Sequence, residues 1–126
     1  MSEIINPQDA ELEEIILGSC LIESKAITLI ADILRPEAFY NEKNLEIYAT
    51  LQSMYRNGQK IDIITVKEEL ARRGKLEFIG GPYTLAHISG RVASSAHLEY
   101  HARILKQKYI RRETILGFHK LLALAA

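Results

Sequence analysis

The chain has 126 residues, 48% hydrophobic and 25% charged, which is typical of one soluble globular domain that buries its own core. Its 16 basic and 16 acidic residues cancel, which argues against a protein whose main task is to grip phosphates. No segment approaches the roughly 20 apolar residues that span a bilayer, no signal-peptide pattern opens the sequence, and the lone Cys20 excludes an internal disulfide framework and suits a reducing cytoplasm.

The first predicted helix follows Pro7, with Asp9 as a candidate N-cap and further acids favoured by the helix dipole in its first turn. Gly18 lies inside this helix, where it costs about 1 kcal/mol relative to alanine, so we expect a neighbouring helix to pass close to it. The apolar stripe of the helix recurs at helical spacing and consists of Leu12, Ile15, Ile16 and Cys20.

Two further helices are predicted before residue 60. The second ends at Arg35-Pro36, because proline disfavours the helical conformation of the residue before it, and its stripe is Ala26, Ile27, Ile30, Ile33 and Leu34. The third spans residues 41–57 and ends at Gly58, a suitable left-handed terminator. A wide apolar arc predicts that this third helix is central, formed by Leu45, Ile47, Tyr48, Leu51, Met54 and Tyr55.

Residues 61–92 predict two short helices. Ile61-Asp62-Ile63 is extended, and Thr65 with Glu68 forms a capping-box pattern at the start of a helix that ends at Gly74. This helix turns Val66 and Leu70 inward. Gly80-Gly81-Pro82 is the sharpest break in the chain, and Pro82 fits the first turn of the next helix. That helix is expected to be lined by Tyr83, Leu85, Ile88 and Val92.

From Ser95 to the end the pattern is one long helix. Its first half has a narrow stripe of Leu98, Ala102, Leu105 and Tyr109. Its second half is apolar around most of the circumference, at Ile115, Leu116, Phe118, Leu121, Leu122 and Leu124. Such a helix needs more than one partner surface. A second copy, a further helix of a hairpin, or burial within the same domain could supply it.

The sequence therefore predicts an all-α fold of about six helices. We expect a compact helical head over residues 1–94 and a long helix over residues 95–126, the first arm of a helical hairpin. The predicted interface for another copy or a partner comprises Tyr109, Ile115, Leu116, Phe118, Leu121 and Leu122.

Charge is distributed unevenly along the chain. Residues 1–24 contain six acids (Glu3, Asp9, Glu11, Glu13, Glu14, Glu23) and no lysine or arginine, whereas the residues from His97 on contain six lysines and arginines against two acids. The two ends could pair within the domain or between copies, or both could be solvated helix faces.

The sequence offers no catalytic, cofactor or metal site. It has no phosphate loop of the Gly-x-x-x-x-Gly-Lys-Ser/Thr kind, so nucleotide hydrolysis is not expected here. His97 and His101 are four residues apart, but the zincin pattern needs Glu directly after the first His, so they are interpreted as a polar face. Cys20 is expected in the core and Asp62 at a helix cap.

The order of several motifs resembles the amino-terminal domain of DnaB-type replicative helicases. These motifs are Pro36-Glu37-Ala38-Phe39-Tyr40, Ile61-Asp62 with Thr65-Val66, Leu70 with Gly74-Lys75-Leu76-Glu77, Gly80-Gly81-Pro82-Tyr83-Thr84-Leu85, and the stretch from Ala96 to Arg112 with Glu99-Tyr100 and Ala102-Arg103-Ile104. The resemblance covers the chain from Pro7 to about Leu116. The chain departs from it at His97, where the family commonly has Asn, and at Tyr83-Thr84-Leu85, where it usually has Tyr-Leu.

The resemblance implies a non-catalytic domain for ring assembly and primase recruitment in DNA replication. In that family the domain forms dimers within a hexamer and docks primase, and a helicase loader is a further possible partner. ATP, Mg²⁺ and most DNA contacts are expected in a separate ATPase domain, in the cytoplasm and away from membranes. Two alternatives remain at this stage, the helicase-docking domain of a primase and a small helical DNA-binding module. The second would use Arg103, Lys106, Lys108, Arg111 and Arg112, whose spacing spreads them around the helix.

Overall fold

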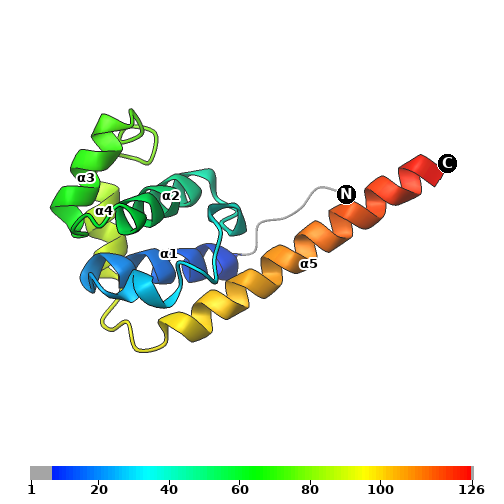
Figure 1. Ribbon diagram of the computed structural model, residues 1–126, viewed down its shortest axis with the longest axis horizontal. Coiled ribbons are helices and arrows are strands. Elements are labelled where there is room, and N and C mark those ends of the chain that lie inside the picture. Colours follow the sequence, from blue (N-terminus) through cyan, green and yellow to red (C-terminus); the bar gives the residue numbers. More distant parts are fainter. Residues whose placement is uncertain (1–6, 126) are drawn as a thin grey trace.

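A computed structural model describes residues 7–125, and within that range all regular structure is helical (Figure 1). The elements are α1 (Pro7–Ile22), η1 (Ala26–Leu29), η2 (Pro36–Ala38), α2 (Glu42–Arg56), α3 (Ile63–Arg72), α4 (Pro82–Gly90) and α5 (Leu98–Ala125), where η marks a 3-10 helix. The all-α prediction of about six helices is confirmed. The proposed division into residues 1–94 and 95–126 stays a prediction.

The helices before α5 form a head, and α5 lies along one side of it before continuing past it (Figure 1). Helix α1 contacts α2, α4 and α5, while α3 contacts α2 and α4. Below, "the head" means α1 to α4 with η1 and η2, and "the arm" means residues 110–125 of α5. The long helix α5 is thus held by the head at its first part, and the arm follows.

The core of the head is built around α2. Tyr48, Leu51 and Leu70 are fully buried, as predicted for a central helix and its neighbour α3. The ring of Tyr48 stacks on Phe39 with 4.7 Å between the centroids, and its hydroxyl donates to the Leu34 carbonyl oxygen at 3.0 Å. Tyr55, which the sequence placed on the same arc, is exposed instead.

The close approach predicted at Gly18 is confirmed. A Cβ atom built on this residue would lie 2.5 Å from Cγ2 of Val92 and 2.7 Å from the carbonyl oxygen of Ile88. Only glycine therefore allows α1 and α4 to pack at this distance. Asp9, by contrast, is not the N-cap of α1, because the helix begins at Pro7 and Asp9 lies in its first turn.

The second predicted helix, which was expected to end at Arg35-Pro36, is not an α-helix. Only Ala26–Leu29 is helical, as one 3-10 turn, and residues 30–33 form turns. A side chain of α2 donates hydrogen bonds to carbonyl oxygens of this segment. Gln52 Nε2 donates to the oxygen of Ala31 at 3.0 Å and to that of Leu34 at 3.2 Å. A segment this short gains little from forming an isolated α-helix, and burial of its apolar side chains holds it instead.

The start of α3 also differs from the prediction. The capping box pairs Asp62 with Thr65, not Thr65 with Glu68, and Ile63 already belongs to the helix. Asp62 Oδ1 accepts from the Thr65 amide at 2.8 Å, and the Thr65 hydroxyl accepts from the Asp62 amide at 2.9 Å. The hydrogen bond from the Thr65 amide lowers the pKa of Asp62. The predicted ends at Gly58 and Gly74 are confirmed, since both have positive φ.

Candidate interface surfaces

The first part of α5 is held against the head by the predicted stripe. Leu98, Ala102 and Leu105 are buried, and Tyr109 is partly buried against the same core. Tyr109 therefore belongs to the contact between α5 and the head, although the sequence grouped it with the interface residues of the arm.

Arg112 makes the last contact of α5 with the head. Its guanidinium carbon lies 5.2 Å from the ring centroid of Tyr40 and 5.6 Å from that of Tyr109. Its Nη2 donates to the carbonyl oxygen of Ala38 at 3.5 Å. These contacts fix the point at which the arm leaves the head.

A buried carboxylate lies close to this contact. Glu13 is only 2% exposed, and its oxygens accept from the Tyr40 amide at 2.7 Å, the Asn41 amide at 3.3 Å and Asn44 Nδ2 at 3.0 Å. Loss of hydration on burial raises the pKa of Glu13, and these hydrogen bonds and the charge of Arg112 offset part of that rise. The carboxylate ties α1 to the start of α2.

The arm exposes the remaining predicted interface residues. Ile115, Leu116, Phe118, Leu121 and Leu122 are all exposed, with Phe118 at 61% and Leu121 at 66%. At 3.6 residues per turn they do not share one side. One stripe, here called the arm stripe, consists of Ile110, Thr114, Gly117, Phe118, Leu121 and Ala125. Leu116 lies on the opposite side, in line with the residues that face the head. Whether the arm stripe forms an interface stays a prediction.

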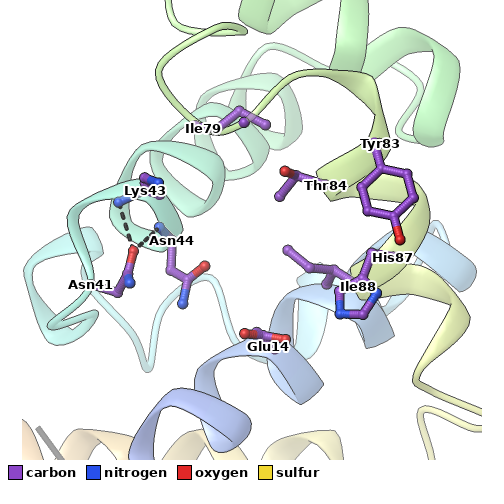
Figure 2. Close-up of a pocket in the computed structure, with 10 residues that line it drawn as sticks. Glu14, Asn41, Lys43, Asn44, Ile79, Tyr83, Thr84, His87 and Ile88 are labelled. Atoms are coloured by element: carbon purple, nitrogen blue, oxygen red, sulfur yellow. Dashed lines mark hydrogen bonds between the residues drawn. The ribbon is translucent and has the colours of Figure 1, made fainter.

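A groove on the head is a second candidate surface, and the sequence analysis did not find it. It has a volume of about 250 Å³ and lies between the first turn of α2, helix α4 and helix α1 (Figure 2). Tyr83 stands at its edge and is 77% exposed, so the expectation that Tyr83 lines the packed face of α4 is wrong. Leu85 and Ile88 do face the core. No local sequence pattern brings these elements together, because their contacts span the whole head.

Several of the unevenly distributed charges pair within the domain. Arg91 contacts Glu14 at 2.5 Å and Glu11 at 3.9 Å, and Lys108 contacts Asp9 at 2.7 Å. Two bases of the proposed DNA-binding set are thus engaged with the head, Lys108 through Asp9 and Arg112 through the tyrosine rings. This arrangement does not favour a nucleic-acid surface on α5.

The described residues hold no group of three or more His, Cys, Asp and Glu side chains that could bind a metal ion. The ring centroids of His97 and His101 are 6.4 Å apart, and burial together with the nearby His97 lowers the pKa of His101. Burial raises the pKa of the Cys20 thiol to about 12, which suits a core residue. Between residues 7 and 125, no helix has the length and apolar character needed to cross a membrane.

The comparison with protein families decides among the readings of this helical domain. The model of the DnaB-like helicase N-terminal domain matches residues 5–107. The chain belongs to this family. DnaB membership also decides against the two alternatives, the docking domain of a primase and a generic DNA-binding module. The match is to the non-catalytic part of replicative helicases.

Curated relatives agree with this assignment. The replicative DNA helicase DnaB of Rhodothermus marinus is 43% identical over 108 residues, covering 86% of this chain and 12% of that protein. The replicative DNA helicase DnaC of Bacillus subtilis (strain 168) is 34% identical over 119 residues, covering 91% of this chain and 26% of the relative. The DnaB-like chain thus spans only a small part of the length of these helicases.

Solved structures share the fold. The N-terminal domain of DnaB helicase from Mycobacterium tuberculosis superposes with a TM-score of 0.86 at 32% identity, covering 93% of this chain and 85% of that one. A DnaB-like replicative helicase, described with its interactions with primase, gives a TM-score of 0.78 at 29% identity over 90% of this chain and 27% of its own.

Proposed function

We propose that this DnaB N-terminal domain assembles a replicative helicase ring and recruits primase to it. The observation that carries the proposal is the arm, which leaves the head at Arg112 and exposes the arm stripe to solvent. An exposed apolar stripe of this kind is usually an interaction surface. The first partner is a second copy, because one arm stripe can cover another across a two-fold axis.

The remaining roles follow from the family. The head docks primase, as the neighbour described with its interactions with primase suggests. ATP, Mg²⁺ and most DNA contacts belong to a separate ATPase domain of the whole helicase. The protein works in the cytoplasm, within a hexamer of such dimers at the replication fork, and a helicase loader is a further partner.

Sedimentation across a concentration series tests the pairing. Phe118→Asp and Leu121→Asp place charges on the arm stripe, so the chain should shift from dimer toward monomer with its helical content nearly unchanged. His119→Asp is the matched control, because it adds a similar group one residue away, outside the arm stripe. The control should dimerise like the unchanged chain.

Two outcomes contradict the proposal. An unchanged chain that stays monomeric at high concentration would show that the arm needs another segment to cover it. Equal weakening by His119→Asp and Phe118→Asp would show that added charge, and not loss of the apolar stripe, causes dissociation. The same substitutions in the full-length helicase should impair ring assembly and primase docking together.

A further inference from the structure

The groove of Figure 2 has no part in the pairing of arms. Its volume of about 250 Å³ is below the roughly 300–1,000 Å³ of small-molecule sites, so it suits one long side chain. Asn44 of α2 lies on one side of it, Thr84 and His87 of α4 on the other, and Glu14 of α1 below (Figure 2). Three elements distant in sequence therefore converge on one small site.

Asn44 supplies an acceptor that the head leaves unused. The residue is only 6% exposed, and its Nδ2 donates to Glu13 Oε1 at 3.0 Å. This bond fixes the orientation of the amide, because a carboxylate accepts and the NH₂ group must face it. No described residue donates to Oδ1 of Asn44, and Figure 2 shows this oxygen pointing into the groove. Solvent reaches this oxygen through the groove, so it can accept a hydrogen bond from a group that enters there.

The other groups around the groove also favour a positively charged donor. Glu14 places a carboxylate at the floor, held on one side by Arg91. Tyr83 presents a largely exposed ring at the edge, stacked on His87 with 6.1 Å between centroids and 17° between planes. Lys43 is the one cationic side chain of the lining, and it is exposed to solvent, where its charge is hydrated and screened.

We propose that this groove receives an arginine side chain from a partner protein. The planar guanidinium can donate to Asn44 Oδ1 and to Glu14 at the same time, and it can stack on the Tyr83 ring. An anion would be repelled by the Glu14 carboxylate and could not donate to Asn44 Oδ1. An apolar side chain would exclude solvent from Oδ1 of Asn44 and leave it unpaired. A lysine ammonium lacks the planar fork that reaches both acceptors. The inference rests on the proposed partner-docking role of the head.

The direct test is a titration of the ¹⁵N-labelled chain with N-acetyl-arginine amide, followed at the side-chain amide signal of Asn44. A saturable shift is expected, with a dissociation constant on the order of millimolar for a single side chain. Glu14→Gln and Tyr83→Ala should each weaken binding several-fold. Tyr100→Ala is the matched control, because Tyr100 is equally an exposed tyrosine but lies on α5.

Titrations with other side-chain compounds test whether the groove prefers the guanidinium group. N-acetyl-lysine amide and N-acetyl-glutamine amide should bind several-fold more weakly than the arginine compound. Equal binding of the glutamine compound, saturation by inorganic phosphate, or no saturation by arginine would each overturn the proposal. The Phe118→Asp chain should bind arginine as well as the unchanged chain does, so failure of this site and failure of arm pairing are separate results.

Discussion

At the scale of single residues, the head depends on polar groups that are buried and paired. Glu13 accepts three hydrogen bonds from the segment that begins α2, across 27 to 31 positions of the sequence. Such a carboxylate joins two elements more specifically than apolar contact does. It also makes the stability of the head sensitive to pH.

The pKa of Glu13 is raised in the folded chain, so the folded state binds this proton more tightly than the unfolded state. The stability from this group is fully present below the unfolded pKa and is lost as pH rises through the folded pKa. We therefore expect the free energy of unfolding, measured relative to Glu13→Gln, to fall as pH rises above the ordinary glutamate pKa of about 4.3. Chemical denaturation at several pH values measures this difference. A difference independent of pH would contradict it.

Gly18 gives a second prediction at this scale. Gly18→Ala gains helix propensity, but its Cβ would meet Val92 and the carbonyl oxygen of Ile88. We expect a net loss of about 1–3 kcal/mol, as in other overpacked sites. Gly117→Ala, measured in dilute solution where the arms are unpaired, is the control, because open space surrounds that position in the single chain and alanine should gain up to about 1 kcal/mol there. Denaturant midpoints compare the two variants.

At the scale of elements, α2 organises the head. It carries the buried Tyr48 and Leu51, and its Gln52 binds the carbonyl groups after η1. Leu51→Ala should lower stability by roughly 2–5 kcal/mol, whereas Tyr55→Ala on the exposed side should cost much less. Thermal unfolding of both variants is the measurement, and equal midpoints would mean that α2 is not central.

Periodicity predicted the helices that have regular stripes and clear ends. The ends of α2 and α3 were predicted from Gly58 and Gly74, because the positive φ that ends a helix is a local property that favours glycine. The segment after α1 was mistaken for a helix because its apolar spacing is helical, while its hydrogen bonds go to Gln52 and Tyr48, far away in sequence. The capping box was shifted by one turn because Asp62 and Thr65 are both good caps.

The two candidate surfaces also differ in whether a local sequence pattern predicts them. The arm followed from sequence because an apolar run at the end of a long helix is a local pattern. The groove did not, because Glu14, Asn44 and Thr84 meet only when α1, α2 and α4 pack together. Tyr109 packs partly against the core, and its interface role stays a prediction, since a half-buried tyrosine fits both an interface and the edge of a core.

At the scale of the whole molecule, the direction of pairing between two arms can be predicted from charge. Glu113 and Lys120 are seven residues apart, so they lie on nearly the same side of α5, beside the arm stripe. Neither makes an ion pair within residues 7–125. Two arms that cross in antiparallel direction near Gly117 would bring Glu113 of each copy beside Lys120 of the other. Gly117, with open space around it, would permit close approach of the two helices.

This geometry predicts the outcome of a charge exchange. Glu113→Lys and Lys120→Glu should each weaken dimerisation several-fold, because each places like charges together at two symmetric positions. The double variant should recover most of the loss, since exposed pairs contribute about 0.2–1 kcal/mol each and reversing both charges restores them. Sedimentation equilibrium at low ionic strength measures the coupling, which should shrink as salt is added. Additive losses in the double variant would exclude the antiparallel arrangement while leaving the apolar contact of the arms intact.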